Sequence, residues 1–156
     1  CRSGSTVGIF ICLPQINIPT VDPDRTLLEK IFLLHEELQR PVKKTRVDRM
    51  SRHLYDIYKL SKSSFAQKAL KNKELYSEIV NHRFQYTKLG GVDYTLHNPK
   101  TINPIPPVQF LDAWKKDYQI MQEQMIHGNS PDFETMIGEI QTYISKINQL
   151  DWQILF

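Results

Sequence analysis

Charged side chains of the types that handle phosphate lie close together in the first third of the chain. Lys30 belongs to one segment, and Arg49, Arg52, His53 and Asp56 belong to a second one. Lysine and arginine neutralise phosphate charge, and an aspartate beside them can hold a metal ion or a proton. The two segments therefore predict a phosphate-handling site, provided that they pack together. The spacing alone also fits a weak surface ion pair between Arg52 and Asp56 and a lysine lying along apolar surface, so both interpretations stay open.

Both segments are predicted to be helices that place these charges beside an apolar stripe. The first begins with Asp22 as N-cap and Pro23 at the first helical position, where a missing N–H costs nothing. Its apolar residues recur at helical spacing: Leu27, Leu28, Ile31, Leu34 and Leu38. Lys30 falls at the edge of that stripe, so we expect it to be half-buried once the helix packs. The second helix is expected from about Val47 to Ser61.

The rest of the chain also favours helices, so the predicted fold class is mainly α. We expect one domain over residues 1–156, a helical bundle-like domain with a short N-terminal β remnant. Its parts are residues 1–20 as strand remnant and lead-in, 21–86 as the helices that carry the site, 87–107 as an irregular connection, and 108–156 as C-terminal helices. Gly and Pro punctuate the connection, and a loop of that length is unusual enough to deserve functional attention.

In the C-terminal part, one helix is predicted from Pro107 to His127, ended by Gly128. Trp114 and Tyr118 lie on its apolar stripe and are expected in the core. A last helix is expected after Ser130, as its N-cap, and runs to about Leu150. The apolar end of the chain, residues 150–156, is expected to dock on the core rather than to meet a partner.

Composition indicates an ordinary globular chain with an uneven charge. The formal net charge is +3, yet residues 40–73 contain eleven Lys and Arg against two acids. A basic block interleaved with Tyr55, Tyr58 and Phe65 suits a phosphate-rich partner, although it also fits a solvated helical face. The longest apolar run is too short to span a bilayer, which predicts a cytoplasmic protein and no membrane partner.

Cysteines and histidines give no sign of a metal site or a disulfide scaffold. Cys1 and Cys12 are the only cysteines and are expected to be reduced thiols. Four histidines are scattered without the spacing of zinc ligands: His35, His82, His97 and His127. We therefore predict no metal ligand among these residues. Because the chain begins with Cys, we expect it to be a trimmed product or a fragment.

Four stretches carry a resemblance to a known family. They are R-T-L-L-E-K-I-F-L-L-H, R-H-L-Y-D-I-Y-K-L, K-A-L-x-N-K-E-L-Y, and D-A-W-K-K-D-Y-x-x-M after Pro106-Pro107. In this order, from about Pro19 to Asn148, they resemble the C-terminal half of the AbiEii/AbiGii nucleotidyltransferase family of bacterial toxins. The resemblance implies a toxin that transfers a nucleotide from an NTP, with Mg²⁺, to an RNA such as tRNA or to a protein acceptor, and it implies a cognate antitoxin.

The resemblance also implies roles for the charged residues. The lysine of its E-K motif matches Lys30, the aspartate of its R-x-x-x-D motif matches Asp56, and both are expected to be catalytic. Arg52 and His53 belong to the same motif and, with Arg49, are expected to bind the phosphates of the nucleotide. Glu29 also matches the E-K motif, without a clear role.

The chain departs from the family pattern at the metal-binding core. Gly4-Ser5 followed by Asp22-Pro23-Asp24 imitates the Gly-Ser turn and Asp-x-Asp pair, but Pro23 separates the two acids at an expected helix start. We therefore expect NTP and Mg²⁺ to be used by the full-length parent, and this chain by itself to bind no cofactor and to be inactive. The alternative is a non-catalytic helical module that binds RNA or an acidic protein through residues 40–73.

Overall fold

The structure, a computed structural model, describes residues 21–155 of the chain. These residues form the α-helices α1 (Pro23–Gln39), α2 (Ser51–Ser61), α3 (Ser64–Ala69), α4 (Lys73–His82), α5 (Val108–Met125) and α6 (Phe133–Asn148). Shorter turns are η1 (Val42–Lys44), the π-helical η2 (Arg83–Thr87) and η3 (Tyr94–His97). Residues 21–155 contain no strand, which confirms the mainly α prediction. The expected β remnant, both cysteines and Gly4-Ser5 lie outside the described residues.

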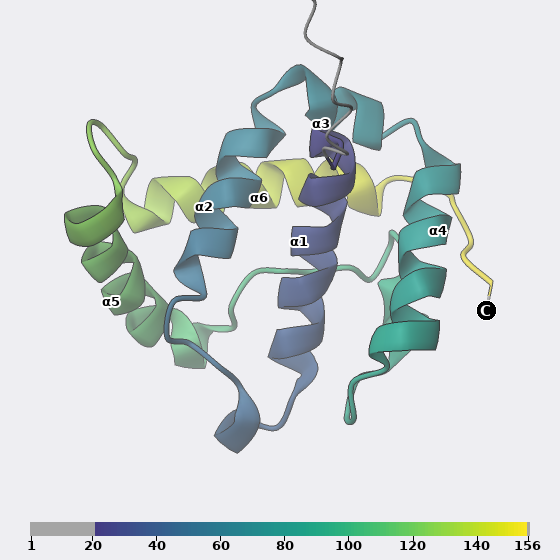
Figure 1. Cartoon of the computed structure of the whole chain (residues 1–156), viewed down its shortest axis with the longest axis horizontal. Coiled ribbons are helices and arrows are strands. Elements are labelled where there is room, and N and C mark those ends of the chain that lie inside the picture. The colour runs from purple at the N-terminus through teal and green to yellow at the C-terminus, as the bar shows by residue number, and fades with distance from the viewer. Residues whose placement is uncertain (1–20, 156) are drawn as a thin grey trace, which may run out of the picture.

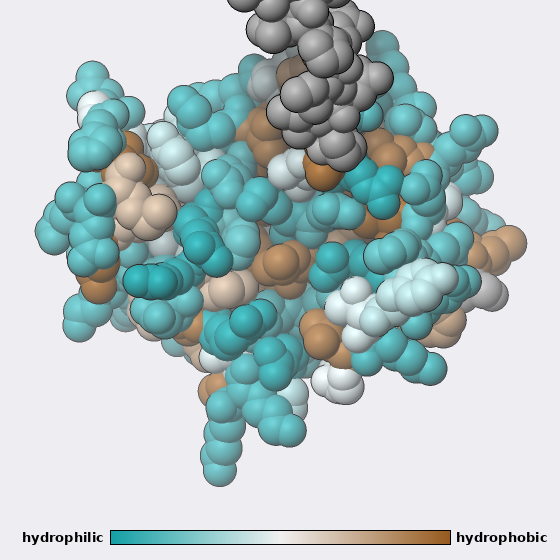
Figure 2. All heavy atoms as spheres, viewed as in Figure 1, coloured by the Kyte–Doolittle hydropathy of each residue, from teal (hydrophilic) through white to brown (hydrophobic). Residues whose placement is uncertain are grey.

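Helix α1 lies at the centre of the domain, with α2 on one side, α4 on the other and α6 crossing behind (Figure 1). α5 stands at the edge of the domain, where it packs against α2. The core between these helices consists of side chains that are almost wholly buried, among them Leu27, Leu34, Leu54, Ile57, Trp114, Tyr118 and Ile140. The stripes on α1 and α2 and the aromatic pair on α5 are thus in the core, as the periodicity predicted. The face drawn in Figure 2 is mostly hydrophilic, and apolar residues show on it in separate small groups.

Two helix starts differ from the prediction. α2 begins at Ser51 rather than Val47, because residues 47–50 form a turn in which Arg49 has a φ of 59°. The N-cap of α6 is Asp132 rather than Ser130, since the Asp132 side chain accepts the N–H of Thr135 at 2.6 Å. In both cases the apolar pattern was right, and local hydrogen bonding moved the first turn.

Residues 87–107 are tied to α1 by a buried polar network. Glu36 accepts hydrogen bonds from Arg83 (2.7 Å) and from Nε2 of His97 (2.9 Å). Burial raises the pKa of the Glu36 carboxyl, but the hydrogen bonds from Arg83 and His97 outweigh it, and the pKa lies below its usual value. The rings of His35 and His97 lie 5.0 Å apart, so two histidines that are remote in sequence meet beside α1. This network fixes the long connection in place.

The end of the chain docks on the core, as expected. Trp152 packs edge-on against Tyr76 with 5.7 Å between ring centroids. Ile154 is buried, and its N–H donates to the side chain of Asn98 at 2.8 Å. Leu155 remains exposed. Among the described helices, none is both long enough and apolar enough to cross a membrane.

Candidate functional site

The packing of α1 against α2 brings Lys30 and Asp56 into contact. Lys30 Nζ lies 2.8 Å from Asp56 Oδ2, and the two side chains are 23% and 44% exposed. The two segments thus pack together, as the predicted phosphate-handling site requires. Lys30 is half-buried at the edge of the α1 stripe, where Leu27 and Leu34 face the core. An ammonium that is paired with one carboxylate at the rim of a helix pair can bind an anion if the anion replaces that carboxylate.

His53 is the third member of this cluster. Its Nδ1 lies 3.4 Å from Lys30 Nζ. Burial, followed by the charges of Lys30 and Arg52, lowers the pKa of His53 to about 4. The imidazole is therefore neutral near pH 7. Because an ammonium only donates, Nδ1 accepts from Lys30 and the ring proton sits on Nε2, which leaves His53 as an N–H donor rather than a cation.

Arg49 and Arg52 face a different neighbour. Both are exposed and line a groove of about 570 Å³ between the start of α2 and α5. The α5 wall of the groove is mixed: apolar Ile120, Met121 and Met125 lie beside polar Asp117 and Gln124. Arg52 forms no ion pair with Asp56 among the residues that the structure describes, because Asp56 pairs with Lys30 instead. The structure thus brings Lys30, His53 and Asp56 together, and it places the two arginines on the adjoining flank of α2.

Asp117 is a residue at this flank that the sequence reasoning missed. It is 8% exposed on α5 and accepts the backbone N–H groups of Arg49 and Ser51 at 2.8 and 2.9 Å. A signal was present, because Asp117 interrupts the apolar stripe that runs through Trp114, Tyr118 and Met121. A buried acid on such a stripe needs hydrogen-bond donors, and here the backbone of α2 supplies them.

Glu29 faces away from the cluster. Its carboxylate pairs with Arg25 at 3.3 Å, and Arg25 also contacts Glu78 of α4 at 2.8 Å. Hydrogen bonds to Glu78 and Glu29 raise the pKa of Arg25 above its usual value. Glu29 therefore belongs to the surface between α1 and α4.

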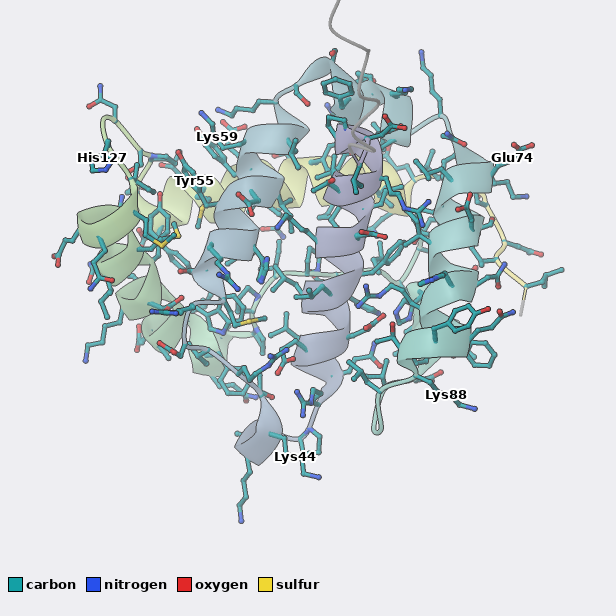
Figure 3. The ribbon with its side chains drawn as sticks, viewed as in Figure 1. Lys44, Tyr55, Lys59, Glu74, Lys88 and His127 are labelled. Atoms are coloured by element: carbon teal, nitrogen blue, oxygen red, sulfur yellow. The ribbon has the colours of Figure 1, made fainter. Side chains whose placement is uncertain are left out.

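The basic block is partly neutralised. The Glu37 carboxylate forms ion pairs with Arg40 at 3.2 Å and with Arg46 at 3.1 Å, and it also accepts the backbone N–H of Arg46. In the described part of the chain, several exposed cations of residues 40–73 have no acidic partner: Lys43, Lys44, Arg49, Arg52, Lys59, Lys71 and Lys73. Lys44 lies beyond the lower end of α2, and Lys59 lies near its upper end (Figure 3). Free positive charge therefore extends along the length of α2.

No group of three or more His, Cys, Asp or Glu side chains within residues 21–155 could hold a metal ion. Asp22 and Asp24 match the spacing of an Asp-x-Asp pair, but each has a local role at the start of α1. Asp24 is buried in the first turn of α1, where its carboxylate accepts the N–H of Arg25 and faces Lys68 at 3.8 Å. Asp22 is exposed at the N-cap position, and its backbone carbonyl accepts the N–H of Thr26. The described residues therefore do not fit a catalytic metal pair.

Comparison with known proteins agrees with the motifs. The family model described as "Nucleotidyl transferase AbiEii toxin, Type IV TA system" matches residues 5–139. Neither the curated proteins nor the solved structures contain a significant match.

Proposed function

Because the chain belongs to the AbiEii family of nucleotidyltransferase toxins from type IV toxin–antitoxin systems, we propose that it serves nucleotide transfer through Lys30 and Asp56. The family implies an antitoxin as partner. The proposed reaction moves a nucleotide from an NTP to a hydroxyl of an acceptor, either the 3′ end of an RNA such as tRNA or a protein. The hydroxyl oxygen bonds to the α-phosphorus, the bond between that phosphorus and the oxygen of the β-phosphate breaks, and pyrophosphate leaves. The observation that carries the proposal is the 2.8 Å contact between Lys30 Nζ and Asp56 Oδ2 at the rim of α1 and α2.

The contact supports a division of labour. A triphosphate carries several negative charges, so it competes with a single carboxylate for the Lys30 ammonium. Once Lys30 turns to phosphate, Asp56 loses its partner and can accept the proton of the attacking hydroxyl or orient that group. A pair that is 23% and 44% exposed can make this exchange at small cost, because surface ion pairs contribute little to stability.

His53 and the two arginines complete the proposed site. His53 accepts from Lys30 through Nδ1 and so holds the ammonium from a second side. Its Nε2–H is a neutral donor for a phosphate oxygen. Arg49 and Arg52 supply guanidinium groups, which bind phosphate in a two-pronged geometry that lysine cannot offer.

The family resemblance implies Mg²⁺, whose chemistry when bound would be to offset the negative charge that develops in the transition state. The residues that the structure describes do not fit that ion, so the proposed steps concern only the binding, orientation and proton transfer that this chain's own side chains perform.

The test is nucleotide incorporation with labelled NTPs, Mg²⁺ and total tRNA. We compare the product of the complete reading frame with its Lys30→Ala and Asp56→Asn variants. Lys59→Ala is the matched control, because Lys59 is an exposed lysine of α2 without an acidic partner in the described residues. We expect loss of labelling in the first two variants and normal labelling in the control. Full activity in both variants would remove Lys30 and Asp56 from the mechanism. We further expect no labelling by residues 1–156 alone.

The second candidate function is RNA or acidic-protein binding without catalysis. The exposed cations along α2 favour it, since an extended polyanion gains from each neutralised phosphate. In that case Lys43→Ala and Lys44→Ala would weaken RNA binding and flatten its salt dependence, while no variant and no parent protein would incorporate nucleotide.

A further inference from the structure

The start of α2 is fixed by a side chain from another helix. Asp117 of α5 accepts the N–H of Arg49 at 2.8 Å and that of Ser51 at 2.9 Å. Each carboxylate oxygen takes one donor, and hydrogen bonds to an ionised acceptor are about twice as strong as neutral ones. Met50 lies between the two donors at the N-cap position, and its side chain forms no capping hydrogen bond with the helix. The first turn of α2 therefore depends on α5.

Arg49 occupies a backbone conformation that an arginine rarely adopts. Its φ is 59°, in a turn closed by the bond from Met50 N to Val47 O at 3.0 Å. The Cβ of an L-residue crowds the following carbonyl in this region, which is why glycine usually occupies it. Such a residue keeps its strain only where surrounding contacts hold it. The two hydrogen bonds to Asp117 are contacts of that kind.

The same turn sets the direction of two arginine side chains, those of Arg49 and Arg52. Arg49 and Arg52 both line the groove between α2 and α5, next to Asp117 itself. If the backbone at Arg49 relaxed to an ordinary helical φ, its side chain would leave from a different side of the turn. A guanidinium on a fixed backbone also loses less conformational entropy when it binds an anion.

We propose that Asp117 is a positioning residue, which holds Arg49 in its left-handed conformation and so keeps Arg49 and Arg52 on the wall of the groove, ready for phosphate. The functional half of this inference rests on the proposed phosphate role of the two arginines. Asp117 does not touch the phosphate. Its carboxylate accepts the N–H groups of Arg49 and Ser51, and the residue as a whole is 8% exposed.

A second acid in the groove separates the effect of negative charge from the effect of positioning. Asp48 also lines the groove, but it is exposed and forms no ion pair among the described residues. Removing a negative charge near an anion site should strengthen anion binding, and this holds for both acids if charge alone matters. A positioning role predicts the opposite sign for Asp117, since its loss releases Arg49.

Isothermal titration calorimetry with inorganic tripolyphosphate, without divalent metal, measures whether each substitution tightens or weakens anion binding. We expect Asp48→Asn to tighten binding about two- to threefold and Arg49→Ala to weaken it about tenfold. Asp117→Asn should weaken binding by a similar factor. Added to Arg49→Ala, it should weaken binding by less than it does in the parent chain, because only the placement of Arg52 is then left to lose. Unchanged or tighter binding by Asp117→Asn would overturn the positioning role.

Urea unfolding tests the hold on Arg49 independently of any ligand. With Asp117 present, Arg49→Gly should unfold at a higher urea concentration than Arg49→Ala, because glycine adopts a positive φ without strain. In the Asp117→Asn chain the order should reverse, since the conformation is no longer imposed and glycine gains more freedom on unfolding.

The two measurements separate the possible failures. Arg49→Gly below Arg49→Ala in the chain with Asp117, a comparison that needs no Asp117 variant to fold, would overturn the inference. An equal gap in both backgrounds would also overturn it. Normal tripolyphosphate binding by Arg49→Ala would overturn the phosphate role in the proposed function, and the unfolding order would still decide whether Asp117 holds Arg49.

Discussion

Helix α2 contacts α1 and α5, two of the helices that pack against it, through different chemical groups. Toward α1, the contact is between side chains: Lys30 meets Asp56 and His53 at a half-exposed rim. Toward α5, the buried Asp117 binds backbone N–H groups. The first contact lies at a partly exposed surface, where an ion pair contributes little to stability. The second cannot open without unmaking the first turn of the helix. Helix α2 therefore has a half-exposed ion pair on its α1 flank and a buried hydrogen-bonded anchor on its α5 flank. We call Asp117 and the α5 residues that support it the frame.

The frame should fail most severely when its apolar support is removed. Trp114 of α5 is 0% exposed, so Trp114→Ala should lower the free energy of unfolding by about 3–5 kcal/mol. Val108→Ala, on an 86% exposed residue of the same helix, should change it by less than about 0.5 kcal/mol. Urea unfolding measures both. A loss below about 1 kcal/mol for Trp114→Ala would mean that α5 contributes little to the frame.

Acid should loosen the opposite side of α1, where His35 packs against the long connection. Burial and the nearby His97 lower the pKa of His35 to about 4, against 6.5 in an unperturbed histidine. The unfolded chain therefore binds the proton more readily, so this contribution is complete above pH 6.5 and is lost as the pH falls toward 4. We expect a loss of about 3 kcal/mol from this residue.

Urea unfolding across that pH range, compared with a His35→Gln chain, isolates the contribution of His35. The variant should show a clearly flatter dependence between pH 6.5 and 4. Parallel curves for the two chains would mean that His35 does not carry the acid sensitivity.

Asp117→Ala should have a smaller but clear effect on the frame. It leaves the N–H groups of Arg49 and Ser51 without their acceptor, which costs about 2 kcal/mol for a capping group of this kind. Asp112→Ala changes an exposed acid of the same helix and should stay within about 0.5 kcal/mol of the parent. Equal effects of the two substitutions on unfolding would contradict the comparison of the two flanks.

The Lys30–Asp56 ion pair should matter least for stability. Lys30→Met and Asp56→Asn each break a partly exposed ion pair, so the free energy of unfolding should change by less than about 1 kcal/mol. Together with lost nucleotide incorporation, a small change would separate function from folding at this rim. A loss above about 2 kcal/mol in either variant would place the pair in the frame instead.

Much of the fold could be predicted because it depends on local periodicity. The stripes of α1 and α2, the core positions of Trp114 and Tyr118, and the docking of the chain end all follow from where apolar residues recur. The starts of α2 and α6 were misplaced, since a helix end depends on which single group caps it. For α2 that group lies 66 residues or more away in sequence.

The sequence by itself determined which side chains are available for chemistry and on which helix flank each one lies. Helical spacing and charge permitted a site shared by Lys30 and Asp56 but fitted surface positions as well, and the family resemblance was what favoured the shared site. Only the tertiary structure decided that Asp56 pairs with Lys30 rather than Arg52, that His53 is neutral, and that Asp117 accepts the N–H of Arg49. Those outcomes depend on burial and on distances between groups remote along the chain, which spacing along one helix cannot encode.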